Sequence, residues 1–348
     1  MRHDPVGALQ PARGGRWLRP RRLAGAAVGL AVLTAAGCSS GSTPGGTVTG
    51  PVIIAAVPGI DTAPLYLAQK DGDFAAAGLR NVVIKSYTSE SAELAALQSG
   101  KADIAASDYG DIFFAQANSP DLRVLADSYD ASAGVLEILT MPGSNISSPA
   151  DLQGQPIGVP NDQLVIGPGS NHAVSLETAA ATQVLTNYLG NGALSMNWKP
   201  MSQQQEISQL QRGVLPAVLV SEPYIYEAQS QFGAVEVLDA YSGSTAGMPL
   251  TGYVATSSWV THNAAAVADF QAAIGNAQAN ASMTGQVQQL LPRTTGMTAA
   301  DADLSTIGTY PTSTSVTGLE RVVRLLANTN VIAKNPPAVP PMIVKPGS

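Results

Sequence analysis

The strongest constraint on the fold is a stretch that occurs twice. Residues 97–108 read LQSGKADIAASD and residues 210–222 read LQRGVLPAVLVSE, with one residue more in the second copy. Each copy combines the end of a helix, a glycine suited to a helix terminus, a short apolar strand, and a serine followed by a carboxylate. A repeated helix–strand unit predicts two similar α/β halves, each with a polar pair at the mouth of a strand.

Short apolar runs alternate with helical patterns along the rest of the chain. VIIAAV at 52–57, VVIKSY at 82–87 and VEVLD at 235–239 predict strands, whereas residues 171–189 space apolar side chains in steps of four. Such alternation is typical of βαβ units and parallel sheets. A chain of 348 residues exceeds what one core usually supports, so we expect two lobes.

The first 37 residues differ in character from the rest. Six arginines precede or flank an apolar run at 23–33 that is too short to span a membrane as a mature helix. Small residues then lead to Cys38, the single cysteine. A lone cysteine cannot form an intramolecular disulfide or supply the clustered ligands of a structural zinc site. The arrangement resembles a bacterial lipobox, with Ala35 where that motif usually has leucine.

The lipobox resemblance implies that residues 1–37 are a lipoprotein signal peptide, that Cys38 becomes the lipidated N-terminus, and that residues 38–50 form a flexible tether. The alternative is an incidental or buried cysteine. The sequence SSGSTPGGTVTG at 39–50 argues against that alternative, because its composition is typical of a linker. The pair Arg21-Arg22 leaves twin-arginine export open beside the general secretory route.

The charge of the mature chain excludes one class of partner. Loss of residues 1–37 removes six arginines and one aspartate, which leaves 12 Lys and Arg against 24 Asp and Glu, a formal charge of −12. So acidic a surface repels phosphate backbones, and we expect no nucleic-acid partner. No later apolar stretch reaches the roughly 18 residues of a spanning helix. We therefore expect contact with the membrane only through the lipid anchor.

The strand mouths locate the candidate binding site. Ligands of open α/β sheets bind beyond the carboxyl ends of the strands, where helix N-termini also point, so two lobes would form a cleft between such edges. Serine and carboxylate side chains also favour helix N-caps, which leaves a purely structural role open for each of them. The residues expected to bind the ligand are Asp61, Thr62, Tyr66, Ser107, Asp108, Tyr109, Gly169, Ser170, Asn171, Ser221, Glu222 and Tyr224.

Four motifs, in order along the chain, resemble a known family. They are APLYLAQKDGDFAAAGL at 63–79, ALQSGKADIAASD at 96–108, SSPADLQGQPIGVP at 147–160 and VLVSEP at 218–223. Together they resemble the substrate-binding proteins of ABC importers, nearest to the branch that takes up nitrate, sulfonates, taurine and the hydroxymethylpyrimidine precursor of thiamine. Pro216 replaces the aspartate usual in this family, so we expect the strand that follows it to start later or to lie at an edge.

The resemblance implies a two-lobed clamshell of the type II periplasmic-binding-protein class, in which each lobe is a parallel-type sheet flanked by helices and two hinge strands lie near 136–142 and 251–257. It also implies a monomer at the outer face of the bacterial cytoplasmic membrane that captures a small solute for a permease and its ATPase. The expected divisions are lobe 1 at 51–142, lobe 2 at 143–250, a helical return to lobe 1 at 251–334, and an irregular tail at 335–348.

Catalysis is not predicted. Once His3 leaves with the signal peptide, only His172 and His262 remain, and neither belongs to a recognisable catalytic motif. The sequence has no phosphate loop and indicates no metal or cofactor. Acids and tyrosines at the strand mouths suit a planar, amino-bearing heterocycle, while backbone N–H groups at helix N-termini keep a sulfonate or nitrate open. A surface-tethered enzyme on the same scaffold and a sensor module without a transported solute are the alternative hypotheses.

Overall fold

The computed structural model describes residues 50–119, 121–161, 165–166, 173–333 and 336–347. These residues belong to one compact unit. The predicted signal peptide, Cys38 and nearly all of the predicted tether lie outside the described residues, and so do three predicted ligand contacts, Gly169, Ser170 and Asn171. Within the described ranges, no helix combines the length and the apolar character needed to cross a membrane.

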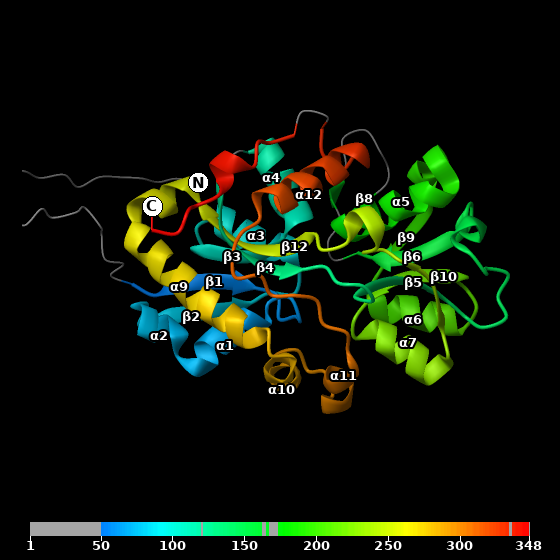
Figure 1. The fold of residues 1–348 in the computed structure, drawn as a ribbon, viewed down its shortest axis with the longest axis horizontal. Helices are drawn as coiled ribbons and strands as arrows, with labels where there is room; N and C mark the ends of the chain where they lie inside the picture. Colours follow the sequence, from blue (N-terminus) through cyan, green and yellow to red (C-terminus); the bar gives the residue numbers. More distant parts are fainter. Residues whose placement is uncertain (1–49, 120, 162–164, 167–172, 334–335, 348) are drawn as a thin grey trace, which may run out of the picture. The chain divides into compact units, whose positions relative to one another are not determined.

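Two five-stranded sheets organise the unit (Figure 1). In spatial order, the first consists of β2 (Val82–Ser86), β1 (Val52–Ala56), β3 (Ile104–Asp108), β12 (Pro249–Thr256) and β4 (Leu122–Asp130). The second consists of β11 (Val235–Asp239), β5 (Leu136–Thr140), β10 (Ala217–Ser221), β6 (Pro156–Pro160) and β9 (Asn197–Met201). A short separate pair joins β7 (Val165–Ile166) to β8 (Ala173–Val174).

Each large sheet has one strand that runs against its neighbours. β12 is antiparallel to β3 and β4, and β5 is antiparallel to β10 and β11, whereas the other pairs are parallel. Both reversed strands come directly after the chain crosses from one sheet to the other, at 131–135 and at 240–248. A chain that enters a sheet at the edge where the parallel strands end must run backwards through it. The predicted two-lobed α/β fold is confirmed, but its sheets are mixed instead of parallel.

The two crossings precede the strands that the resemblance implied as hinges. β5 pairs along its whole length with β10, and β12 pairs with β3 and β4, so both are full members of a sheet. The links between the sheets are therefore residues 131–135 and 240–248, and not the segments 136–142 and 251–257. The predicted lobe boundaries stay predictions.

Helices flank both sheets, and serine caps begin several of them. Ser89, Ser175, Ser202 and Ser315 each accept a hydrogen bond from the backbone N–H three residues further on. Serine favours this position because its hydroxyl satisfies one of the N–H groups that lack a partner within the helix. The helices are α1 (Ala63–Asp71), α2 (Asp73–Ala77), α3 (Glu90–Gln98), α4 (Tyr109–Asn118), α5 (Leu176–Leu189), α6 (Gln203–Gln211), α7 (Tyr224–Phe232), α8 (Ser257–His262), α9 (Ala264–Ala281), α10 (Thr284–Thr294), α11 (Ala299–Leu304) and α12 (Val316–Asn328), with short 3-10 turns η1 (Pro149–Leu152), η2 (Gly190–Ser195), η3 (Gly243–Thr245) and η4 (Pro340–Met342).

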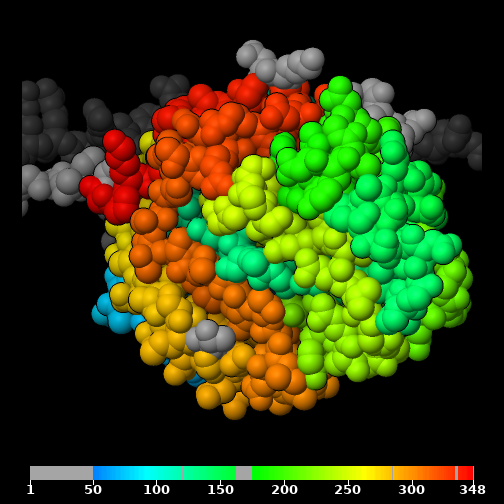
Figure 2. All heavy atoms as spheres, turned by 45° about the vertical axis from the view of Figure 1, so that its right-hand side comes forward, coloured from blue at the N-terminus to red at the C-terminus, as the bar shows by residue number. Residues whose placement is uncertain are grey.

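The last long helices contact elements of both sheets. α12 packs against α5 and against α4, and α11 packs against α7. Figure 2 shows the orange surface of this C-terminal part directly beside the green surface of the second half. The buried face of α12 consists of Leu319, Val322, Val323 and Leu326 among others, as the apolar spacing predicted. The C-terminal part of the chain thus joins the two halves instead of packing on one.

The repeat holds in the structure up to the end of its strand. α3 begins at Glu90 and β3 ends at Asp108, while α6 begins at Gln203 and β10 ends at Ser221, a separation of 18 residues in both copies. The extra residue of the second copy therefore falls after its strand. Ser221 takes the place of Asp108, and Glu222 takes the place of Tyr109.

The expectation that β10 is delayed or lies at an edge is wrong. β10 lies between β5 and β6, in the middle of the second sheet, and begins at the same distance from its helix as β3 does. Pro216 stands directly before the first paired residue, so its missing N–H removes no bond from the ladder. Its carbonyl instead accepts a hydrogen bond from the Thr140 hydroxyl at 2.7 Å.

The end of the chain packs on the first sheet. Residues 336–347, here called the C-terminal segment, have little regular structure apart from η4, yet Val339 and Met342 are buried. Ile343 bridges Val124 of the edge strand β4, and the Val344 N–H donates to the Val124 carbonyl at 2.9 Å. The segment therefore covers an edge that would otherwise offer unpaired backbone groups.

Candidate ligand-binding site

A cavity of about 260 Å³ lies where the strand ends of the two sheets meet. The carboxyl ends of β1, β3, β4, β10 and β11 lead into it, and the reversed strands β5 and β12 start from it. This is the edge at which open α/β sheets bind ligands. The first half contributes Val57, Pro58, Gly59, Ile60, Asp61, Glu90, Asp108, Tyr129, Leu250 and Thr251, and the second contributes Val135, Leu136, Glu177, Gln203, Ser221, Glu222 and Tyr241.

Asp108 is a helix cap that also faces the cavity. Its Oδ1 accepts hydrogen bonds from the backbone N–H groups of Gly110 at 2.6 Å and Asp111 at 3.4 Å, in the first turn of α4. Its own backbone N–H donates to Glu90 Oε2 at 3.1 Å. Burial, followed by the nearby carboxylates of Glu177 and Asp111, raises the pKa of Asp108 well above its usual range. The cap and the cavity wall are therefore one residue.

The loop after β1 is held by hydrogen bonds on both sides. The Thr62 hydroxyl accepts from the Gly59 N–H at 2.9 Å and donates to the Val57 carbonyl at 2.8 Å. Asp61 Oδ2 accepts from the Thr251 hydroxyl at 3.0 Å, which ties the loop to the start of β12. Burial raises the pKa of Asp61. Thr62 thus shapes the loop, and Asp61 presents its carboxyl group to the cavity.

The second half builds the same connection with a neutral residue. The Ser221 N–H donates to Gln203 Oε1 at 2.8 Å, the counterpart of the bond from Asp108 to Glu90. Glu222, the next residue, accepts from the Tyr226 N–H at 3.1 Å in the first turn of α7 and from the Thr306 N–H at 2.9 Å. Burial raises the pKa of Glu222. Its carboxyl group links α7 to a segment 84 residues away in the chain.

Four of the predicted ligand residues line the cavity: Asp61, Asp108, Ser221 and Glu222. Five other predicted residues belong to the described part of the chain but are not among the residues that line the cavity: Thr62, Tyr66, Ser107, Tyr109 and Tyr224. A ligand contact by any predicted residue stays a prediction.

The structure explains why two of these predicted residues do not line the cavity. Tyr109 is the first residue of α4 and is fully buried, and its hydroxyl donates to the Asp127 carboxylate on β4. Its ring stacks on Phe113 with 5.7 Å between ring centroids. Ser107 precedes Asp108 on β3 and is also fully buried. Because successive side chains of a strand point to opposite faces, its side chain points away from the face that Asp108 presents to the cavity.

Several lining residues were not predicted from the sequence. Glu90 and Gln203 each follow a capping serine at the start of a helix, so extending the repeat seven residues towards the N-terminus would have found both. Tyr129 lies just before the first crossing and Tyr241 lies within the second, and no local pattern reveals where the chain crosses. Glu177 lies in the first turn of α5, where an acidic residue is ordinary.

The described lining has five carboxyl groups and no lysine, arginine or histidine. Burial, followed by the neighbouring Asp108 and Glu93 carboxylates, raises the pKa of Glu90 well above its usual range. Within the described ranges, no group of three or more histidine, cysteine or acidic side chains is arranged to hold a metal ion. The cavity is thus suited to an organic group that donates hydrogen bonds.

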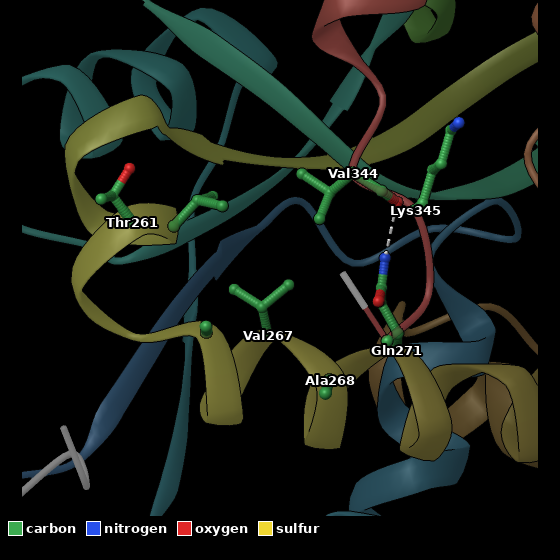
Figure 3. Close-up of a pocket in the computed structure, with 9 residues that line it drawn as sticks. Thr261, Val267, Ala268, Gln271, Val344 and Lys345 are labelled. Atoms are coloured by element: carbon green, nitrogen blue, oxygen red, sulfur yellow. Dashed lines mark hydrogen bonds between the residues drawn. The ribbon is translucent and has the colours of Figure 1, made fainter. Parts of the chain in front are cut away.

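Other cavities lie on either side of the C-terminal segment. One of about 480 Å³ is lined by β4, α9 and residues 311–316, mostly with apolar groups. Another, of about 190 Å³, lies beside α8 and α9, where the Gln271 side-chain amide donates to the Val344 carbonyl at 3.0 Å (Figure 3). Neither lies where strand ends of the two sheets meet.

Comparison with known proteins agrees with this architecture. Residues 60–166 match the family model described as NMT1/THI5 like. No match was found among curated protein sequences. The predicted resemblance to solute-binding proteins is thereby confirmed for that segment and, by the structures that follow, for the fold.

Solved structures extend the similarity over most of the chain. The alkanesulfonate-binding protein SsuA from Xanthomonas axonopodis pv. citri, bound to MOPS, has a TM-score of 0.67 at 15% identity, covering 85% of this chain and 98% of that one. The periplasmic aliphatic sulphonate binding protein SsuA from Escherichia coli has a TM-score of 0.62 at 17% identity, covering 83% and 95%. At such identities the similarity establishes the fold alone.

An enzyme shares this fold. The desulfurization enzyme DSZB has a TM-score of 0.60 at 16% identity, covering 85% of this chain and 96% of that one. The architecture therefore hosts both binding proteins and catalysts, and the choice between them depends on the residues of the site.

Proposed function

We propose that this chain is an extracytoplasmic solute-binding lipoprotein of an ABC importer. In this role it captures a small organic solute between two lobes and delivers it to the permease. The solute classes that follow from the resemblance are a heterocycle like the thiamine pyrimidine, a sulfonate or taurine, and nitrate. The chain would act as a monomer at the outer face of the cytoplasmic membrane, held by a lipid on Cys38.

One observation carries the proposal: strand ends from both sheets, with one residue from each crossing, line the same cavity of about 260 Å³. Because the sheets are joined by crossings at 131–135 and 240–248, a ligand held between them would bias how the two halves approach each other. Asp61, Asp108, Ser221 and Glu222 are the proposed ligand contacts. The NMT1/THI5-like segment and the fold shared with sulfonate-binding proteins support this role.

The experiment that tests the function is native mass spectrometry of the protein purified under mild conditions, followed by identification of any small molecule released on unfolding. A stoichiometric solute that raises the unfolding temperature and is recovered unchanged after prolonged incubation is the expected result. Ligand at 100 times its dissociation constant should add about 2.7 kcal/mol of stability. Steady conversion of the solute would instead support a tethered enzyme.

The lipid anchor has its own test. Cys38→Ala removes the thiol that would carry the lipid, so the protein should move from the membrane fraction to the medium or stay unprocessed. The effect should be large, because several acyl chains anchor a protein far more firmly than one. Mass spectrometry of the N-terminal peptide identifies the modification directly. Unchanged membrane association of the variant would contradict the anchor and leave solute binding untouched.

A further inference from the structure

The charges around the cavity are all of one sign. Asp61, Glu90, Asp108, Glu177 and Glu222 line it, and the described lining has no basic side chain. The first half contributes three of these acids and the second half two, so the carboxyl groups come from both halves instead of from one wall. A ligand that enters meets carboxyl groups from both sheets.

Two buried polar groups in this wall have unused bonding capacity. The Tyr241 hydroxyl belongs to a residue that is only 4% exposed, and it makes no hydrogen bond within the described part of the chain. Asp108, also 4% exposed, receives two N–H groups at Oδ1, and its Oδ2 has no bond to a described residue. Both side chains belong to buried residues that line the cavity, so their free oxygens are available to a ligand that enters it.

The chemistry of that partner follows from the charges. A carboxylate oxygen accepts hydrogen bonds, and a carboxylate buried among others is stabilised by a nearby positive charge and destabilised by a negative one. A sulfonate or nitrate here would add a further negative charge at short range, where solvent screens poorly. Burial already raises the pKa of Asp61, Asp108 and Glu222, which means that their charged forms are disfavoured while the cavity has no cation.

We infer that the solute is a small organic cation whose charged nitrogens donate hydrogen bonds, as in an amidinium, guanidinium or ammonium group. This inference rests on the proposed solute-binding function and narrows its ligand class, since it excludes the sulfonate and nitrate classes. Asp108 Oδ2 and the carboxyl groups of Asp61 and Glu222 would accept from the cationic group. The rings of Tyr129 and Tyr241 add polar aromatic walls that tolerate a cation.

One competing arrangement must be tested with it. Carboxyl groups that hold protons become hydrogen-bond donors and would then accommodate an anion. The groups concerned are the five lining acids with Glu93 and Asp111, which lie close enough to raise the pKa of Glu90. The two arrangements have opposite pH dependence, because a cation binds the ionised acids, whereas an anion binds the protonated ones.

The test uses three probes with the same ring and different charge: benzamidinium, benzamide and benzenesulfonate. Isothermal titration and thermal unfolding at about pH 7.5 should give binding in that order, with benzamidinium at least about tenfold tighter than benzenesulfonate. Between about pH 5 and pH 8 benzamidinium keeps its charge, so its affinity should rise with pH as the acids ionise. A wider set of small amines and guanidines covers differences in shape.

Variants assign the effect to the cavity. Asp108→Asn keeps a capping side chain, since asparagine caps helices as well as aspartate, and should weaken the cationic probe about tenfold without weakening benzenesulfonate. Tyr241→Phe should weaken it about threefold. Asp303→Asn, which removes an exposed carboxyl group on α11 outside the cavity, should leave the affinity within about twofold of the parent.

Two results would overturn the inference. In the first, an anionic probe binds as tightly as the cationic ones and binds more tightly as the pH falls. In the second, neither benzamidinium nor any of the amines and guanidines binds. The first would leave the proposed solute-binding function standing, with a different ligand class. Failure of that function is a separate result, because it would appear as the absence of any co-purified solute or as its chemical conversion.

Discussion

The two copies of the repeat share a backbone and differ in the side chains that they bring to the cavity. In both, the N–H at the end of a strand donates to the first side chain of the preceding helix, Glu90 in one copy and Gln203 in the other. Tyr109 of the first copy is fully buried and does not line the cavity. Its counterpart in the second copy, Glu222, does line it. The hydrogen bond that shapes each copy is kept, while the groups beside it are exchanged.

The exchange depends on what lies opposite on the reversed strand. Gly252 of β12 pairs with Ser107, next to Tyr109, and the equivalent place in the second sheet holds Glu137 of β5, which pairs with Val220. A side chain at Gly252 would overlap the Tyr109 ring, so only glycine leaves room for that ring. Each half therefore has an adapted partner strand, and a repeat in sequence does not imply the same packing.

Filling the space above Tyr109 should have the largest effect. Gly252→Ala is expected to lower the free energy of unfolding by about 1–3 kcal/mol, because the ring is held by its bond to Asp127 and by its stacking on Phe113. Urea unfolding measures the change.

Gly285→Ala is the control for a glycine in open space: a methyl group there meets no neighbouring atom within 4 Å, and alanine in α10 should keep or raise the stability. Equal stability of the two variants would mean that Tyr109 moves easily and that this difference between the halves has no energetic weight.

The two strand ends should differ in their value to the fold. Asp108→Ala is expected to be about 1 kcal/mol less stable than Asp108→Asn, because alanine cannot cap α4. Ser221→Ala should lose about 0.5 kcal/mol, since its hydroxyl bonds only to Gln203 and does not cap α7. Chemical unfolding of the three variants decides the order, and a loss at Ser221 as large as that at Asp108 would make the two strand ends equivalent.

The smallest expected effect is on the pH dependence of stability, and it involves the acids on either side of the first crossing. Burial, and then the nearby Asp127 carboxylate, raises the pKa of Asp130 to about 7, and burial followed by Glu236 and Asp239 raises the pKa of Glu137 to about 7. Burial also raises the pKa of Asp127 to about 6. All three exceed their values in an unfolded chain, near 4. The folded state therefore binds more protons than the unfolded state between about pH 4 and pH 7.

Stability should accordingly decrease as the pH rises through this window and level off above about pH 7. Thermal unfolding temperatures between pH 5 and pH 8 measure the slope. Asp130→Asn should make this slope smaller by removing the acid on the first sheet, and Glu137→Gln should do so by removing the acid on the second. An unfolding temperature that rises over the same interval would contradict the buried, protonated state of these acids.

The sequence was informative wherever a signal was local. The repeat predicted two α/β halves, and the spacing of Leu319, Val322 and Leu326 predicted the buried face of α12. Asp61, Asp108, Ser221 and Glu222 were placed at strand mouths, and all four line the cavity. Helix periodicity and strand-end chemistry both depend on residues close together in the chain, which is why they could be found without a structure.

What the sequence did not reveal depends on contacts between distant residues. Tyr129, just before the first crossing, and Tyr241, within the second, reach the cavity because the chain passes from one sheet to the other there, and the reversal of β5 and β12 has the same cause. Tyr109 was expected in the site because it follows Asp108, yet its direction is set by Gly252, far along the chain. The shared ending of serine and carboxylate suggested that Glu222 corresponds to Asp108, whereas the strands make Ser221 its counterpart, because the correspondence depends on strand pairing.

The direction of β1 has a consequence for how an anchored molecule would work. β1 starts at Val52 and ends beside residues 57–61, which line the cavity, so the point at which the chain joins the predicted tether lies at the opposite edge of the first sheet. The thirteen residues at 38–50 reach about 45 Å when fully extended. If residues 38–50 form the predicted tether, a tether of that length would let the body turn until its cavity faces the proposed permease. Tether length would thus govern docking frequency, while affinity for the solute would not depend on it.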